Sequence, residues 1–174
     1  MNLYIMRHGS TVWNEKGIIQ GQSNNRLSIN GKQMVEKVAK KFANTPFDAI
    51  VCSPLMRTIQ TANIMNKYHN VKIIKDPQII EINQGIFSGK KRSSLTENEQ
   101  KLQQMRLKEN GQETLAEIDA RIENFVQNIK TKYPYKNLLI VTHDICAVIM
   151  EHFLCNKPFG GIKFANAEIK KFRI

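Results

Sequence analysis

The sequence predicts an α/β protein, a three-layer α/β/α sandwich around a mostly parallel central sheet. Short apolar runs alternate along the chain with longer segments whose apolar residues recur at helical spacing. The runs at 3–6, 49–52 and 138–141 are apolar throughout, as expected of strands that are buried on both faces. Each run leads into a polar stretch that contains reactive side chains. Because ligands bind at the carboxyl edge of such sheets, the same pattern predicts where the functional site lies.

The amino-terminal half is expected to contain two strand–helix units. Ser28 or Asn30 begins the first helix, and Pro46 marks its end. Long loops in compact domains are often functional, which draws attention to the polar stretch after the first strand. The expected elements are strands at 3–6 and 49–52, a polar loop at 12–26, and helices at about 28–45 and 55–68.

The carboxyl-terminal half continues the alternation. Thr114 and Glu117 form a capping-box pattern, which opens a helix with apolar positions from Leu115 to Ile129. Residues 90–110 are charged, compatible with helix and only weakly periodic, which indicates a helical flap outside the core. The other expected elements are strands at 71–74 and 137–142, an extended segment at 79–82, a helix at 145–154 and two short strands in the tail at 162–174.

Composition limits the classes of partner. The 174 residues fit a single domain over 1–174, and the net charge of +11 points to anionic partners. Nucleic acid is disfavoured, because no basic run is interleaved with aromatic residues and aromatic residues make up only 7% of the chain. No run approaches the ~20 apolar residues of a membrane span, and there is no leader pattern. We therefore expect a cytoplasmic monomer or homodimer without a nucleic-acid or membrane partner.

The three cysteines show no metal-ligand spacing. Cys52, Cys146 and Cys155 are odd in number and lie in apolar surroundings. We expect all three to be buried thiols, and we expect no metal and no cofactor.

The first strand delivers Arg7, His8 and Gly9, a combination suited to phosphate chemistry. An imidazole can attack phosphorus and hold the phosphoryl group covalently, while a guanidinium donates paired hydrogen bonds to phosphate oxygens. Gly9 is expected to let the backbone approach a ligand closely. The tripeptide alone could equally be a surface turn. Two further strand ends, carrying the turn up to Arg57 and the pair His143–Asp144, converge on the same edge and favour the functional reading.

Several ordered motifs resemble the histidine phosphatase superfamily, the phosphoglycerate mutase-like proteins, over nearly the whole chain. The matching stretches are 7–14 (RHGSTVWN), 53–62 (SPLMRTIQTA), 81–89 (EINQGIFSG), 111–114 (GQET), 141–143 (VTH) and 166–167 (NA). Two positions depart from the pattern. Residues 23–27 stand where the family commonly reads Asp-x-Pro-Leu, and Asp144 stands where the mutase-like branch usually has Gly. The resemblance implies the phosphoglycerate mutase-like sandwich with a short helical lid at about 90–110.

The resemblance also implies roles for individual residues. His8 would be the nucleophile that becomes a phosphohistidine, and Glu81 the general acid that protonates the leaving alcohol. The residues implied to bind the phosphoryl group or the rest of the substrate are Arg7, Asn14, Gln20, Gly21, Arg57, His143 and Asp144. A basic pocket of this kind would work without a metal.

Alternatives remain at two of these positions. Asp144 rivals Glu81, because the acid-phosphatase-like branch resembles His-Asp and uses that aspartate as the proton donor. Glu81 could instead be only a salt-bridge partner of nearby arginines.

The implied function is hydrolysis of a phosphomonoester on a small anionic metabolite. Mutases resemble a longer version with Arg and Tyr where this chain has Ile82 and Gln84, so a small phosphatase is favoured. Mutase-type transfer, a protein phosphohistidine phosphatase and a non-catalytic phosphate-binding module are the alternatives. The basic residues from Lys90 to Lys108 suggest that the substrate carries further negative charge, with Lys90, Lys91 and Arg92 as the expected contacts, unless they form a solvated face.

Overall fold

The computed structural model describes residues 1–156 and 163–174, and its described strands form one sheet in the order β3-β2-β4-β1-β5. The strands are β1 (Asn2–Arg7), β2 (Ala49–Cys52), β3 (Lys72–Lys75), β4 (Asn137–Thr142) and β5 (Ile169–Arg173). Neighbours from β3 to β1 are parallel, and β5 pairs antiparallel with β1. The expected mostly parallel sheet is confirmed.

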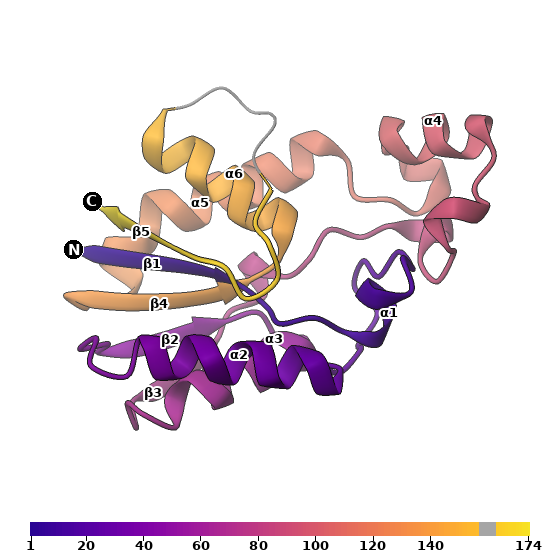
Figure 1. Ribbon diagram of the computed structural model, residues 1–174. Helices are drawn as coiled ribbons and strands as arrows, with labels where there is room; N and C mark the ends of the chain where they lie inside the picture. Colours follow the sequence, from indigo (N-terminus) through magenta and orange to yellow (C-terminus); the bar gives the residue numbers. More distant parts are fainter. Residues whose placement is uncertain (157–162) are drawn as a thin grey trace.

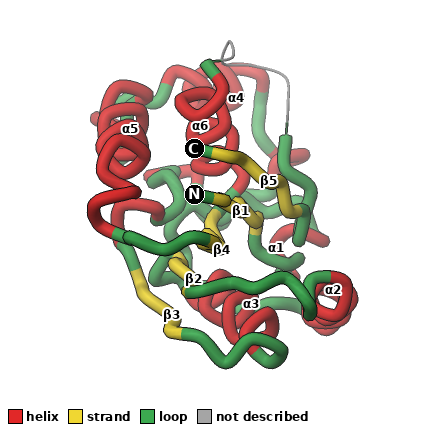
Figure 2. Tube along the Cα trace, turned by 90° about the vertical axis from the view of Figure 1, so that its left-hand side faces the viewer, coloured by secondary structure: helices red, strands yellow, loops and turns green. Residues whose placement is uncertain are grey.

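Helices cover both faces of this sheet (Figures 1 and 2). α2 (Ile29–Lys41) and α3 (Met56–Asn66) lie on one face, and α5 (Leu115–Lys132) and α6 (Asp144–Cys155) lie on the other. Thr114 accepts a hydrogen bond from the Glu117 backbone, and the Glu117 side chain reaches back, so the expected capping box opens α5. The fold is the α/β/α sandwich that the sequence predicts.

Alternation along the strands divides the core between the two faces. Leu3 and Ile5 of β1 pack in the cluster with α5 and α6, whereas Tyr4 and Met6 pack in the cluster with α2 and α3. Successive side chains of a strand point to opposite faces, and here both faces are covered. This explains why the strands read as uninterrupted apolar runs.

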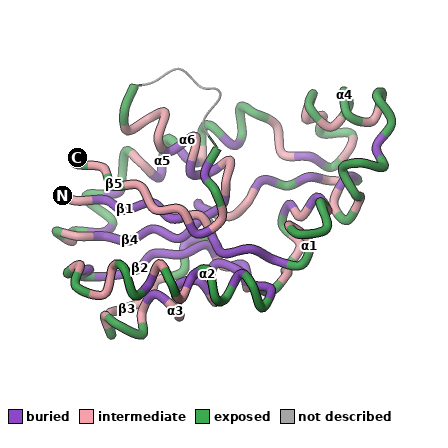
Figure 3. Tube along the Cα trace, viewed as in Figure 1, coloured by how far each residue is buried: buried purple, intermediate pink, exposed green. Residues whose placement is uncertain are grey.

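The chain between Gly85 and Gly111 leaves the sandwich. It contains α4 (Glu97–Met105) and short 3₁₀ turns at Gly85–Phe87, Arg92–Ser94 and Lys108–Asn110. Figure 1 places α4 beyond the carboxyl ends of the strands, and Figure 3 shows its mostly exposed surface. Its inner side rests on a small separate cluster of Ile19, Phe87 and Leu95. The expected helical flap is present, and we call residues 90–110 the α4 segment.

Four local expectations are wrong. The loop at 12–26 begins with a short helix, α1 (Val12–Glu15), which Thr11 caps. Leu115 is 50% exposed, because it is the first residue of α5 and lines a surface cavity, although it shares the helix face of buried Ile118 and Ile122. Residues 163–168 form no strand, so the described tail contributes only β5; the first tail residue, 162, lies outside the described residues. Cys155 is exposed at the end of α6, whereas Cys52 and Cys146 are buried as expected.

Within the described residues, no helix has the length and apolar character needed to cross a membrane.

Candidate active site

The ends of three parallel strands meet at one edge of the sheet. His8 follows β1 and donates its backbone N–H to the carbonyl of Thr142 in β4 (3.0 Å). Ser53 follows β2 and donates its N–H to Val141 of β4 (3.1 Å). This ladder fixes the residues after β1, β2 and β4 beside one another, so the predicted convergence is present.

A cavity of about 750 Å³ opens at this edge. Its walls come from the strand ends, from α6 and from the α4 segment. The lining residues that bear on function are Arg7, His8, Asn14, Gln20, Arg57, Glu81, Gln84, Arg92, Gln103, Arg106, Asp144 and Lys163.

The His8 ring is 2% exposed, and its two nitrogens have different partners. Nδ1 lies 2.7 Å from the carbonyl oxygen of Gly9, which can only accept, so Nδ1 carries the proton. Nε2 therefore has a free lone pair and accepts a hydrogen bond from Nε of Arg57 at 3.2 Å. Burial, and then the charge of Arg57, hold the pKa of His8 well below 6.5. The result is a neutral imidazole whose unprotonated nitrogen faces a guanidinium.

Arg57 is fully buried in the first turn of α3. Nη1 donates to the carbonyl of Ser23 (2.7 Å) and Nη2 to the carbonyl of Gly21 (2.8 Å). Burial lowers the pKa of Arg57 to about 10, so it remains a cation at neutral pH. Gly21 is not among the residues that line the cavity; its carbonyl holds Arg57 instead.

His143 is fully buried beside His8, with the ring centroids 5.2 Å apart. Its Nε2 lies 2.8 Å from Oγ of Ser53. Its Nδ1 lies 3.9 Å from Oε2 of Glu81 and has no hydrogen-bond partner within the described residues. Burial, then the charge of Arg57, hold the pKa of His143 well below 6.5, so this ring too is neutral. Ser53 is a positioning contact that the sequence reading did not single out.

Arg7 and Asp144 face each other across the cavity rim. Nη1 of Arg7 lies 3.4 Å from Oδ2 of Asp144, and Oδ1 of Asp144 accepts the backbone N–H of Phe164 (2.9 Å). The Arg7 guanidinium also donates to the carbonyl of Phe164. Nε of Arg7 is buried and without a partner in the described part of the chain. Both oxygens of Asp144 are thus engaged in binding Arg7 and the chain after α6.

Glu81 lines the cavity from the loop after the 3₁₀ turn at Pro77–Ile79. Its Oε1 accepts the backbone N–H of Ile82 at 2.9 Å. Burial raises the pKa of Glu81 above its ordinary value, although the charges of Arg57 and Arg7 oppose the shift. A carboxyl group with a raised pKa beside a buried neutral histidine fits proton donation better than a simple salt bridge.

A clamp that the sequence reading missed holds the loop of Glu81. Arg121 of α5 binds Glu113 through two nitrogens, Nε to Oε1 (2.5 Å) and Nη2 to Oε2 (3.0 Å), and donates to the carbonyl of Gln78 (2.8 Å). Glu113 accepts the backbone N–H of Asn83 (3.3 Å) and donates its own N–H to the carbonyl of Asn83 (3.1 Å). Both ends of residues 78–83 are therefore fixed to α5.

Two other predicted residues, Asn14 and Gln20, line the cavity. Oδ1 of Asn14 accepts hydrogen bonds from Thr11, which fixes the plane of the Asn14 amide at the cavity. Oε1 of Gln20 is buried with no partner in the described chain. Gly9 is not among the residues that line the cavity. A Cβ there would lie 2.5 Å from Cγ2 of Val35 and 2.8 Å from the carbonyl of Gly31, so the glycine allows α2 to pack.

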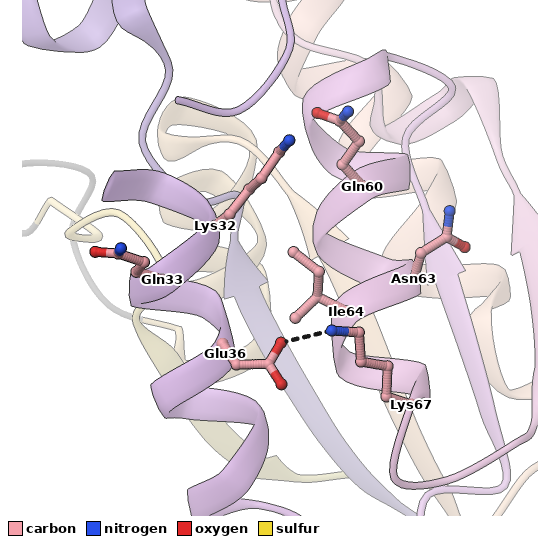
Figure 4. A pocket seen from close by; sticks show the side chains of 7 residues that line it. All are labelled: Lys32, Gln33, Glu36, Gln60, Asn63, Ile64 and Lys67. Carbon is pink, nitrogen blue, oxygen red and sulfur yellow. Dashed lines mark hydrogen bonds and ion pairs between the residues drawn. The ribbon is translucent and has the colours of Figure 1, made fainter. Parts of the chain in front are cut away.

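A second hollow, of about 430 Å³, lies between α2 and α3 (Figure 4). Its carboxylate, Glu36, is bound by Nζ of Lys67 (2.9 Å) and by the hydroxyl of Tyr68 (3.2 Å). No histidine, cysteine or serine lines it, so the cavity at the strand ends is the candidate active site. Within the described chain no three His, Cys, Asp or Glu side chains are grouped as metal ligands would be.

Two neutral imidazoles lie beside arginines at the carboxyl edge of the parallel sheet, which is the arrangement expected of a phosphoryl-transfer site of the histidine type. Comparison with known proteins agrees: the histidine phosphatase superfamily (branch 1) matches residues 3–174. The chain belongs to this superfamily, which confirms the resemblance seen in the sequence and the expectation of a phosphatase enzyme.

Individual relatives fall among mutases and phosphatases. The chain is 30% identical over 151 residues to a probable phosphoglycerate mutase GpmB of Yersinia enterocolitica, covering 83% of this chain and 70% of the relative. It is 28% identical over 151 residues to phosphoserine phosphatase 1 of Hydrogenobacter thermophilus, covering 83% and 72%.

Solved structures show the same fold. A mycobacterial glucosyl-3-phosphoglycerate phosphatase superposes with a TM-score of 0.86 at 20% identity, covering 98% of this chain and 90% of that chain. A putative alpha-ribazole-5'-P phosphatase of Escherichia coli superposes with a TM-score of 0.89 at 19% identity, covering 100% and 91%.

Proposed function

We propose that this protein hydrolyses phosphomonoesters through a phosphohistidine formed on Nε2 of His8. The observation that carries the proposal is the state of this ring: Nδ1 is bound to the Gly9 carbonyl, and the Nε2 lone pair faces the cavity cation Arg57. A neutral imidazole of this kind needs no base to become nucleophilic. In the first step Nε2 attacks phosphorus, a P–N bond forms, and the ester P–O bond breaks.

Arg7, Arg57 and His143 would hold the phosphoryl oxygens while this bond exchange takes place. Guanidinium groups donate paired, charge-assisted hydrogen bonds to phosphate, and preorganised donors stabilise the charge that spreads in the transition state. Nε of Arg57 now donates to the nucleophilic nitrogen, so an arriving phosphoryl oxygen replaces His8 as its acceptor. The Asn14 amide, fixed by Thr11, would add a neutral donor.

Glu81 would donate the proton to the leaving alcohol and then take a proton from the attacking water. That water displaces His8 from phosphorus, so phosphate leaves and the imidazole is regenerated. Two observations favour Glu81 over Asp144 in this role. Glu81 is held in the raised-pKa state that a proton donor needs, whereas both oxygens of Asp144 already bind Arg7 and Phe164.

Hydrolysis is favoured over mutase-type transfer because the α4 segment has little apolar packing over the site. The segment is mostly exposed and packs on a cluster of only Ile19, Phe87 and Leu95 among the described residues. A cover of this kind lets water reach the phosphoenzyme. We propose that residues 1–174 act as one domain, with the α4 segment as its lid.

The substrate would be a small anionic phosphorylated metabolite, with no metal or cofactor in the reaction and no nucleic-acid or membrane partner. The cavity of about 750 Å³ and its basic lining support a substrate of this size and charge. The three free cysteines fit a reducing, cytoplasmic setting.

The test is hydrolysis of p-nitrophenyl phosphate in EDTA by the wild type, His8→Ala and the control His69→Gln. His69 lies outside the cavity, where its ring packs on Phe47 (centroids 4.7 Å apart). We expect EDTA-resistant turnover that His8→Ala abolishes and His69→Gln retains. A rapid quench in detergent at alkaline pH should trap an acid-labile, alkali-stable phosphoenzyme in the wild type and in His69→Gln, but not in His8→Ala. Turnover that survives in a folded His8→Ala variant would refute the proposal.

A further inference from the structure

Arg106, in the α4 segment, has an unsatisfied charge inside the cavity. It lines the cavity, and its Nη1 is buried with no hydrogen-bond partner within the described residues. Burying a guanidinium nitrogen without an acceptor is unfavourable, so such a nitrogen calls for an explanation. Burial lowers the pKa of Arg106, while the charges of Glu81 and Glu113 oppose the shift and that of Arg92 adds to it. The group thus feels the active-site charges but is bound by none of them.

The backbone holds Arg106 in this position. Arg106 ends α4 with φ +52° and ψ +64°, a left-handed conformation that usually belongs to glycine. The next N–H, of Leu107, donates to Oε1 of Gln112 (3.3 Å), whose Nε2 donates to the carbonyl of Gln103 (3.0 Å). Gln103 in turn binds Oε1 of Gln84 (3.0 Å), three residues after Glu81. These contacts hold the end of α4 against the loop that carries Glu81, and they keep Arg106 facing the cavity.

Arg92 is the other cation that the α4 segment contributes to the cavity lining. Its backbone N–H binds the carbonyl of Gly17 (2.9 Å), which fixes the residue at the rim. The remaining basic residues that were expected to act here do not line the cavity. Lys90 binds Glu99 (2.8 Å) and lies over the Phe87 ring. Lys90 and Lys91, which were expected to contact the substrate, thus do not line the cavity.

The cavity has more positive charge than one phosphoryl group requires. Five basic side chains line it, Arg7, Arg57, Arg92, Arg106 and Lys163, against the carboxylates of Glu81 and Asp144. Asp144 is already paired with Arg7. When Arg57 and Arg7 hold the transferred phosphoryl group, the two arginines of the α4 segment still lack an anion.

We propose that Arg106, assisted by Arg92, binds a second anionic group of the substrate. This inference rests on the proposed phosphatase function and narrows its substrate class to small phosphomonoesters that carry a carboxylate or a second phosphate. A guanidinium fork matches both groups, and binding would supply the acceptor that Nη1 lacks. Arg106 is then a specificity-determining residue, not part of the phosphoryl-transfer step.

The test compares 3-phosphoglycerate with glycerol 3-phosphate, which differ in one end group, a carboxylate or a hydroxymethyl. Arg106→Gly deletes the guanidinium while suiting the left-handed backbone, so folding is retained. Its control is Lys91→Gln, which removes one exposed charge from the same segment but none from the cavity lining. A second pair of substrates, fructose 1,6-bisphosphate and fructose 6-phosphate, tests whether the second anionic group is a phosphate.

We expect Arg106→Gly to lower kcat/KM for the doubly anionic member of at least one pair by about 10- to 100-fold, the range of a hydrogen bond to a charged group. In Arg106→Gly, kcat/KM for the singly anionic member of each pair and for p-nitrophenyl phosphate should change by less than about threefold. In Lys91→Gln, kcat/KM should change by less than about threefold for every substrate, because exposed charges are screened. An equal loss on both members of each pair, or no loss on either, would overturn the subsite.

Binding to His8→Ala, measured by calorimetry, keeps the two proposals separable. This variant leaves substrates intact, and Arg106→Gly in its background should remove the preference for 3-phosphoglycerate or for the bisphosphate. If the wild type turns over no ester but this preference and its loss are seen, the phosphatase proposal fails and the subsite stands. If turnover is normal and no preference depends on Arg106, only the subsite fails.

Discussion

The clamp between Arg121 and Glu113 leads to a prediction about Glu81, which neither clamp residue touches. Arg121→Met would remove two hydrogen-bonded contacts to Glu113, at 2.5 and 3.0 Å, and one to the carbonyl of Gln78 at 2.8 Å. Since Glu113 also holds Asn83, both ends of the loop that carries Glu81 would loosen. Arg121 would therefore be a positioning residue for Glu81, the proposed general acid.

The expected loss of stability follows from how far the side chains of Arg121 and Glu113 are exposed. The side chains of Arg121 and Glu113 are 19% and 15% exposed, so the loss is smaller than the roughly 3–5 kcal/mol of a fully buried pair, about 2 kcal/mol of unfolding free energy. A displacement of the acid by about 1 Å would lower kcat by about 10- to 100-fold for an alkyl phosphate, whose leaving group needs the proton. For p-nitrophenyl phosphate the loss should stay within about threefold, because that leaving group departs as the anion.

The assay therefore measures kcat for an alkyl phosphate and for p-nitrophenyl phosphate in Arg121→Met and in Lys170→Met. Lys170 forms a comparable ion pair with Glu151 (2.6 Å, 22% and 12% exposed) between β5 and α6, and neither residue lines the cavity. Both variants should lose similar stability in urea unfolding, but only Arg121→Met should separate the two substrates. Equal losses on the two substrates in Arg121→Met would show that the clamp is only structural.

Three further predictions concern the same site and its support. Glu81→Gln should slow alkyl phosphates by about 10²–10⁴-fold but p-nitrophenyl phosphate far less, and equal losses in steady-state assays would remove its role as the acid. Because the pKa values of His8 and His143 lie well below 6.5, the unfolded chain binds more protons than the folded one below that pH. In urea titrations the free energy of unfolding should therefore fall by about 1.4 kcal/mol per histidine for each pH unit below about 6.5. The slope should be smaller in His8→Asn, and an unchanged slope in that variant would contradict the prediction. Gly31→Ala should lower the free energy of unfolding in urea by about 1–3 kcal/mol, because its Cβ would lie 1.9 Å from the Ser10 carbonyl oxygen. A Cβ at Gly17 has nothing within 4 Å, so Gly17→Ala should lower it by only about 1 kcal/mol. Equal losses in the two variants would argue against the clash.

The sequence predicted the parts of this site that a parallel sheet places by itself. Arg7, His8 and His143 stand directly at strand ends, and Arg57 stands in the first turn of the helix after a third strand, so adjacency of the strands brings them together. The strands could be located in the sequence as apolar runs, because both faces of the sheet are buried.

Contacts made across long stretches of chain were not predictable. Asp144 looked like a rival acid because its occupation by Phe164, twenty residues later, depends on how the tail returns to the site. Arg106 and Lys90 looked alike as basic residues of one segment. Only the packing of the weakly periodic α4 segment shows that Lys90 binds Glu99 while Arg106 faces the cavity. Such partners carry no local sequence signal, because surface polar patterns are compatible with many arrangements.

The surplus of cations in the cavity has an effect on the nucleophile as well as on the substrate. Burial, together with the charges of Arg57 and Arg7, lowers the pKa of His8, so Nε2 stays unprotonated under conditions in which an exposed histidine would be partly charged. A phosphoryl group bound to the same guanidiniums would cancel much of that field, and the ring would then tolerate the positive charge that develops as Nε2 attacks. The arginines would thus favour the reactive neutral form of His8 before binding, and the bound phosphoryl group would offset their charge as the ring becomes positive. A neutral replacement such as Arg57→Met would lose both effects, whereas Arg57→Lys would retain the field at His8 and lose the paired hydrogen bonds.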